Sequence, residues 1–128
     1  MKEARYDLED RLLDYASRII KLVERLPDTR VANHVGGQLL RSGTSPLSNH
    51  GEAEAAESPS DFIHKLKICL KELRESYRWL LLIQRVPIVQ PADSLEALVK
   101  ETDELIRIFT KSIQTAKRNA ASHSHPVS

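Results

Sequence analysis

The sequence of 128 residues lacks the features typical of secreted, membrane-spanning or disulfide-stabilised proteins. It contains one cysteine, Cys69, which can form no internal disulfide. No apolar run approaches the roughly 20 residues that a membrane-spanning helix needs. The first eleven residues carry acidic side chains where a signal peptide needs an apolar segment, so we expect a cytoplasmic protein with no membrane partner.

Catalytic and metal-binding motifs are also missing. There is no phosphate-binding Gly-x-x-x-x-Gly-Lys loop, no zinc-binding spacing and no Gly-x-Ser-x-Gly turn. A di-iron bundle needs two Glu-x-x-His pairs, and only Asp61-Phe-Ile-His64 comes near that pattern. We interpret His64 as a partly exposed helix residue, His123 and His125 as parts of a solvated tail, and Cys69 as a buried, inert thiol. The sequence predicts no enzyme, cofactor, metal or small-molecule substrate.

The overall charge is nearly balanced, because 19 basic and 18 acidic residues give a net charge of +1. Such a balance argues against a globally basic nucleic-acid-binding protein. The two halves differ, however, since residues 1–64 carry a net charge of −3 and residues 65–128 a net charge of +4. Any surface that attracts an acidic partner should therefore lie in the second half.

Apolar side chains recur at helical spacing in four segments, and no stretch alternates like a strand. The predicted helices cover about residues 5–26, 30–57, 59–84 and 93–118. Pro27 ends the first, Asp28 or Thr29 caps the second, and Ser58-Pro59 opens the third. We expect an all-α, antiparallel, up-down-up-down four-helix bundle over residues 1–118. Residues 119–128 show no apolar period and are predicted to form a disordered tail.

The second predicted helix has an unusual inner face and an internal proline, Pro46. Proline removes a backbone hydrogen bond, so we expect a kink near Gly43 to Pro46, or two shorter helices that meet at Ser45. The inner positions are mostly small or polar, which allows neighbouring backbones to come close. These positions are Val35, Leu39, Ser42, Pro46, Asn49, Ala53 and Ala56.

The third predicted helix has more apolar side chains than one core face can hold. Its expected core face consists of Phe62, Leu66, Cys69, Leu73, Tyr77 and Leu80. The surplus lies in a separate sector formed by Ile68, Trp79, Leu82 and Ile83. Such a sector is typical either of a wide core contact or of a subunit interface, in which tryptophan is a favoured anchor. We favour the subunit interface.

Basic residues form a stripe nearly opposite the core face of this helix. The stripe consists of Lys67, Lys71, Arg74, Arg78 and Arg85. It fits two interpretations, a solvated face that makes ordinary ion pairs or a surface that binds the phosphates of RNA or DNA. No cluster of aromatic residues lies near the stripe to stack bases, as single-strand binders usually do.

Several short motifs resemble a known family. They are Arg41-Ser-Gly-Thr-Ser45, Asn49 followed by Glu52-Ala53, Ser58 followed by Asp61-Phe62, and Lys71-Glu72 followed by Glu75. The pattern is similar to that of the bacterial four-helix-bundle proteins encoded in intervening sequences of 23S ribosomal RNA genes, over nearly all of residues 5–118. Pro46 and Leu47 depart from the family pattern, which has a β-branched and a small residue there.

The resemblance implies an antiparallel four-helix subunit, a ring-like homopentamer and no established catalytic residues. It also implies kinship with the accessory proteins of diversity-generating retroelements, basic pentamers that bind a reverse transcriptase and nucleic acid. Two functions are therefore expected. One is a non-enzymatic oligomeric scaffold that contacts RNA or a ribonucleoprotein through Lys67, Lys71, Arg74 and Arg78. The other is a protein–protein adaptor ring with no nucleic-acid role.

Within the motif that matches the family, we expect Arg41, Ser45, Asn49 and Glu52 to have structural roles. Asn49 and Glu52 lie three residues apart on one helix face. A buried or interfacial glutamate needs partners, so we hypothesise that Arg41 or Lys65 supplies the opposite charge to Glu52. We expect Asn49 to bond the backbone near the kink.

Overall fold

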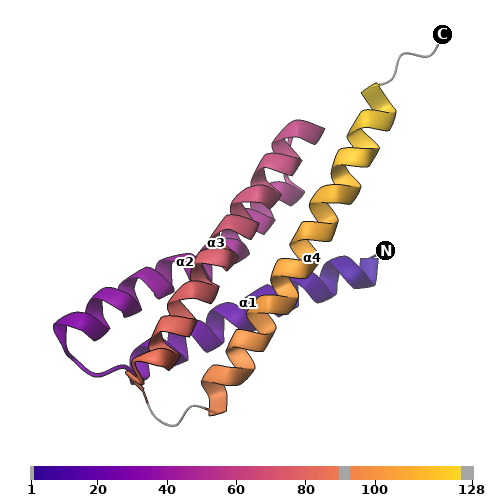
Figure 1. Ribbon diagram of the computed structural model, residues 1–128. Helices are drawn as coiled ribbons and strands as arrows, with labels where there is room; N and C mark the ends of the chain where they lie inside the picture. Colours follow the sequence, from indigo (N-terminus) through magenta and orange to yellow (C-terminus); the bar gives the residue numbers. More distant parts are fainter. Residues whose placement is uncertain (1, 90–92, 125–128) are drawn as a thin grey trace.

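The computed structural model describes the backbone of residues 2–89 and 93–124 and the side chains of residues 8–89 and 95–122. The chain forms four helices, α1 (Lys2–Arg25), α2 (Arg30–Glu54), α3 (Pro59–Arg85) and α4 (Asp93–Ser124). Successive helices run in opposite directions (Figure 1), and the described ranges contain no strand. The predicted all-α four-helix bundle is confirmed. In the same ranges, no helix combines the length and apolar character needed to cross a membrane.

The starts of α2 and α3 are fixed by side chains that satisfy free backbone N–H groups. The hydroxyl of Thr29 accepts a hydrogen bond of 3.1 Å from the N–H of Ala32, so Thr29 rather than Asp28 caps α2. The hydroxyl of Ser58 accepts a bond of 3.1 Å from the N–H of Asp61. The predicted serine cap of α3 is therefore confirmed.

Two helix ends differ from the sequence prediction. α2 ends at Glu54 instead of Glu57, because Ser58 adopts an extended backbone as the cap of α3 and the chain needs residues 55–57 to turn. α4 continues past Arg118 to Ser124, so the prediction of disorder is wrong for residues 119–124. Loss of the apolar period does not end a helix by itself, and no glycine or proline follows before Pro126. The rest of the predicted tail, residues 125–128, lies outside the described residues.

The core takes side chains from all four helices. Helices that are adjacent in sequence are also neighbours in space, and α1 meets α4 only over a short stretch where the two cross obliquely (Figure 1). At this crossing, Arg11 binds both carboxylate oxygens of Glu101, through Nη2 at 2.7 Å and Nε at 3.0 Å. This bidentate ion pair helps to hold α1 on the bundle.

A buried hydrogen-bond chain also connects α1 to α4. The oxygens of Tyr15 and Thr102 are 2.7 Å apart, and both residues are fully buried. Because the Thr102 hydroxyl donates to the carbonyl of Leu98 at 2.7 Å, Tyr15 is the donor to Thr102. Burial raises the pKa of Tyr15 to about 12, so the phenol stays protonated and keeps its donor role.

α2 remains one helix across Pro46, which excludes the alternative of two shorter helices, while the kink stays a prediction. Small residues let α2 lie close to its neighbours on both sides. Toward α3, the hydroxyls of Ser42 and Ser76 bond at 2.8 Å, and both side chains are fully buried. Toward α1, a β-carbon on Gly43 would lie 2.8 Å from Cγ1 of Ile19.

We expect Gly43→Ala to lower the free energy of unfolding by about 1–2 kcal/mol. The new methyl group would overlap Ile19, which is fully buried and branched close to the backbone, and overpacking typically costs more than the helix propensity gained. The matched control is Gly37→Ala, whose β-carbon would meet no atom within 4 Å. This control should gain about 0.5–1 kcal/mol. Urea unfolding midpoints report the stability of both variants. Equal midpoints for the two would contradict the close approach of α2 to α1 at Gly43.

Candidate functional site

The outer surface of α3 carries a row of four exposed cations, Lys67, Lys71, Arg74 and Arg78, which we call the basic face. Their spacing of four, three and four residues places them on one side of the helix, over about 16 Å of its length. Among the described side chains, none of the four forms an ion pair. Within the described residues, the only side-chain hydrogen bond of this row joins Arg78 to the carbonyl of Arg74, at 3.5 Å.

Two of the three acidic residues of α3, Glu72 and Glu75, pair with one arginine of α2. Arg41 of α2 binds the carboxylate of Glu72 at 2.9 Å and also pairs with Glu75. Glu75 in turn accepts a hydrogen bond of 3.0 Å from the indole N–H of Trp79. Both carboxylates are thus directed to Arg41, and neither forms an ion pair with a cation of the basic face.

Residues of the RSGTS-containing motif lie along the α2–α3 contact. Asn49 donates to the carbonyl of Ser45 at 3.1 Å and to its hydroxyl at 2.8 Å. Lys65 lies 2.9 Å from Glu52, and their hydrogen bond lowers the pKa of Glu52 and raises that of Lys65. The side chain of Glu52 is 59% exposed, so it is not buried within the chain. Arg41 lies elsewhere, on Glu72 and Glu75, and the charge next to Glu52 comes from Lys65.

The four residues predicted for a subunit interface do not form one exposed sector. Ile83 is fully buried and belongs to the core of the chain, so it is unavailable to a second copy. Trp79 is half-buried and lies edge-on against His34 of α2, with ring centroids 6.1 Å apart. Ile68 is also half-buried, whereas Leu82 is 40% exposed. The sector thus divides between the core and the surface, and Leu82 is its most exposed member.

The cysteine and the histidine of α3 show no features of a reactive site. Cys69 is fully buried, as predicted, and its thiol donates to the carbonyl of Pro46 at 3.6 Å. Burial raises the pKa of this thiol to about 12, which leaves almost no nucleophilic thiolate at neutral pH. His64 is exposed. The side chains of His123 and His125 lie outside the described residues.

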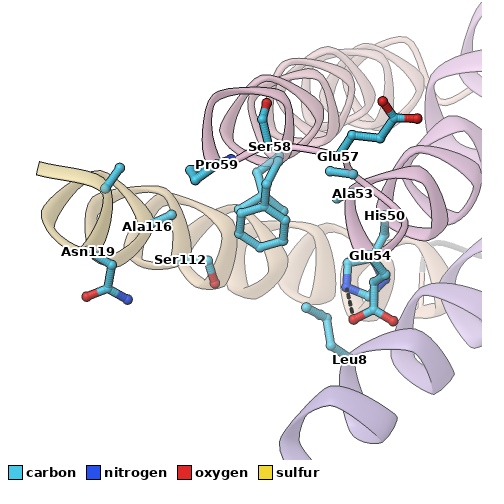
Figure 2. A pocket seen from close by; sticks show the side chains of 14 residues that line it. Leu8, His50, Ala53, Glu54, Glu57, Ser58, Pro59, Ser112, Ala116 and Asn119 are labelled. Carbon is cyan, nitrogen blue, oxygen red and sulfur yellow. Dashed lines mark ion pairs between the residues drawn. The ribbon is translucent and has the colours of Figure 1, made fainter. Parts of the chain in front are cut away.

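An open cavity of about 780 Å³ lies at the end of the bundle where α2 connects to α3. Figure 2 shows its walls, which come from the C-terminal parts of α2 and α4, the start of α3, and Leu8 of α1. Phe62, Leu66, Ala53 and Ala116 make much of the lining apolar. His50 and Glu54 form one edge, where the two side chains face each other.

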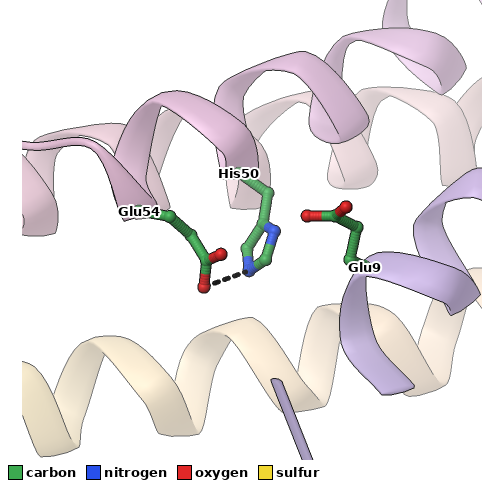
Figure 3. Close-up of side chains that lie close together, drawn as sticks. All are labelled: Glu9, His50 and Glu54. Carbon is green, nitrogen blue, oxygen red and sulfur yellow. Dashed lines mark ion pairs between the residues drawn. The ribbon is translucent and has the colours of Figure 1, made fainter. Parts of the chain in front are cut away.

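His50 belongs to a compact cluster with Glu54 of α2 and Glu9 of α1 (Figure 3). One nitrogen or oxygen atom from each residue lies within 4.8 Å of the other two. Helical periodicity does not indicate this cluster, because it predicts Asn49 on the inner face of α2, whereas the buried residue is His50. Part of the cluster could be recognised from the sequence, since His50 and Glu54 are four residues apart and therefore share a helix face.

Comparisons with known proteins bear on the fold of the whole chain. A solved structure of a protein of unknown function from the S23 ribosomal protein family of Bacteroides thetaiotaomicron VPI-5482 is 35% identical, with a TM-score of 0.76. The match covers 82% of this chain and 96% of the other. No curated protein matches the sequence. The family model described as 23S rRNA-intervening sequence protein matches residues 6–111. The resemblance predicted from the sequence motifs is confirmed, and the chain belongs to the family of 23S rRNA-intervening sequence proteins.

Proposed function

We propose that the protein is a non-enzymatic RNA-binding scaffold that contacts phosphate groups through the basic face of α3. The observation that carries the proposal is the state of this face, whose four cations are all exposed and, among the described residues, unpaired. A phosphate that approaches them displaces counterions and has no ion pair to break.

Some cations elsewhere on the chain differ from those of the basic face, although Lys21 and Lys111 are likewise exposed and make no ion pair among the described residues. Arg11, Arg41, Lys65 and Arg107 each lie within 3.1 Å of a carboxylate. The chain thus has enough acidic residues to pair with exposed cations, yet it directs these acids away from the basic face. The feature that favours phosphate binding over a solvated surface is the regular spacing of four cations, unpaired among the described residues, on one side of α3.

The composition of the basic face favours contacts with the RNA backbone over contacts with bases. Stacking of unpaired bases requires exposed aromatic side chains. The tryptophan of α3, Trp79, is half-buried against His34 and donates its N–H to Glu75. Double-stranded RNA is recognised mainly by shape and by phosphate and 2′-hydroxyl contacts, so a structured RNA helix is the ligand that this surface fits best.

RNA binding should depend steeply on salt. If the basic face neutralises four phosphates, the slope of log K against log salt concentration should be about −3 to −4. Affinity for an RNA duplex should then fall about 60- to 250-fold between 50 and 200 mM salt. A fluorescence-anisotropy titration measures this slope. If anisotropy does not change as protein is added at 50 mM salt, the proposal is wrong.

Paired charge variants locate the RNA contact. Lys71→Gln with Arg74→Gln should weaken RNA binding roughly 30-fold at 100 mM salt and should reduce the slope by about 2. The control, Lys21→Gln with Lys111→Gln, removes the same charge from exposed positions of α1 and α4. The control should bind nearly as well as the parent chain, and equal losses in both variants would show that no defined face is used.

Self-association is the second element of the proposal. At the C-terminal end of α3, Leu81, Leu82 and Val86 are 39%, 40% and 52% exposed, and a surface hollow lies between Leu82 and the cations Arg78 and Arg85. Neighbouring exposed apolar side chains favour contact with another protein surface. The homopentamer implied by the family resemblance would place several basic faces on one particle, which increases affinity for a long RNA.

We expect the purified chain to have five times its chain mass of 14.5 kDa in solution, measured by light scattering. Leu82→Glu should dissociate the assembly because it buries a charge in an apolar contact. Leu40→Glu is the matched control, since Leu40 lies on α2 and is 39% exposed. A parent chain of 14.5 kDa, or equal dissociation by both variants, would contradict association through the end of α3.

The alternative function is a protein adaptor ring with no nucleic-acid role. The exposed apolar end of α3 supports it, because that end fits a protein partner as well as a second copy. Solution mass and RNA affinity together distinguish the two functions. An intact assembly with no affinity for RNA at low salt supports the adaptor, whereas salt-dependent binding lost in the Lys71 and Arg74 variant supports the RNA scaffold.

A further inference from the structure

We propose that Glu9, His50 and Glu54 form a binding site for a divalent transition-metal ion that links α1 to α2. One potential ligand atom from each residue lies within 4.8 Å of the other two. Figure 3 shows the imidazole ring of His50 between the carboxylates of Glu9 and Glu54. A metal ion at this point would therefore bind three side chains from two helices.

The burial of His50 is the observation that distinguishes this cluster from a chance group of surface acids. His50 is 4% exposed, and its Nδ1 atom is fully buried with no hydrogen-bond partner among the described residues. The other nitrogen, Nε2, lies 3.9 Å from a carboxylate oxygen of Glu54, which is longer than a hydrogen bond. A buried nitrogen normally has a partner, and coordination to a metal would supply one.

The rest of the fold holds the imidazole ring in place. The ring of His50 meets the ring of Phe109 in α4 edge-on, with ring centroids 6.1 Å apart and ring planes at 89°. His50 and Glu54 are four residues apart on α2, the spacing that brings two side chains to one side of a helix. Because the ring is fixed by packing, little conformational freedom is lost when it binds an ion.

The donor atoms indicate which ions fit. One imidazole nitrogen and two carboxylate oxygens suit Zn²⁺, Co²⁺ or Mn²⁺, whereas Mg²⁺ and Ca²⁺ prefer oxygen ligands only. Three protein ligands leave the fourth position of a tetrahedral zinc ion open to water. We therefore infer Zn²⁺ as the preferred ion on grounds of ligand type and intrinsic affinity.

Only small movements are needed to close the site. With metal–ligand bonds of about 2.1 Å, tetrahedral ligand atoms lie about 3.4 Å apart. The ligand atoms of Glu9, His50 and Glu54 already lie within 4.8 Å of one another, so each needs to shift by only about 1 Å. Glu9 is exposed and the side chain of Glu54 is 25% exposed, so both carboxylates have room to move inward.

Titration of the full chain tests the site directly. After treatment with a chelator and its removal, we expect one Zn²⁺ per chain to bind with micromolar or tighter affinity in isothermal calorimetry, and Mg²⁺ to show no binding. Co²⁺ should produce visible absorption typical of a low-coordinate ion with nitrogen and oxygen ligands. Absence of zinc binding would overturn the proposal.

Substitutions outside the core show which residues bind the ion. Glu9→Gln and Glu54→Gln should each weaken Zn²⁺ binding at least tenfold, because they replace a carboxylate with a poor ligand. Glu57→Gln, which alters another acid at the cavity but outside the cluster, should have no effect. Folding of each variant is checked by circular dichroism, and variants that bind zinc as the parent does would contradict the assignment.

The histidines near the C-terminus provide a further control because they are another potential source of zinc affinity. Replacement of both His123 and His125 by alanine should leave the binding constant unchanged. Loss of binding in this double variant would overturn the proposal in favour of a terminal site. Saturating Zn²⁺ should also raise the melting temperature of the parent by roughly 5–10 °C and that of Glu9→Gln much less, since the ion joins α1 to α2.

Discussion

The close approach of α2 to both of its neighbours is the constraint on which the rest of the bundle depends. Toward α1, the missing side chain of Gly43 leaves space for Ile19, and toward α3, Ser42 and Ser76 meet through their hydroxyls. Such small residues bury little apolar area themselves. They bring the helices near enough for larger side chains on all four helices, such as Tyr15, to share a single core.

The same packing explains why α2 continues across Pro46. Proline costs a helix one backbone hydrogen bond and crowds the preceding turn. Pro46 is fully buried, its carbonyl accepts the thiol of Cys69 from α3, and Asn49 donates to a carbonyl one turn earlier. These contacts outweigh the intrinsic preference of proline. The continuous helix fixes the positions of Arg41 and His50, which lie on either side of Pro46 and serve different surfaces.

Periodicity and capping residues predict the four helices because apolar spacing is a local property of the sequence. Which residues of a helix are buried depends on how that helix is rotated about its axis against its neighbours. The apolar pattern of a single helix does not specify this rotation. Ser76 and His50 are buried, whereas the prediction selects their sequence neighbours Tyr77 and Asn49. For the same reason Ile83 belongs to the core. The basic face is predictable from spacing, but its lack of ion pairs depends on tertiary contacts made by α2.

Packing alone does not explain why position 50 is a histidine. The ring lies against Phe109 beside the apolar wall of the cavity, and a leucine there would fill the space without an unpartnered polar atom. Glu9, far away in the sequence, lies near the ring because α1 packs against α2, closely so at Gly43 and Ile19. The packing of α1 on α2 thus also brings a buried imidazole between two carboxylates, and a ligand that supplies a partner to its unpaired nitrogen explains this arrangement better than packing does.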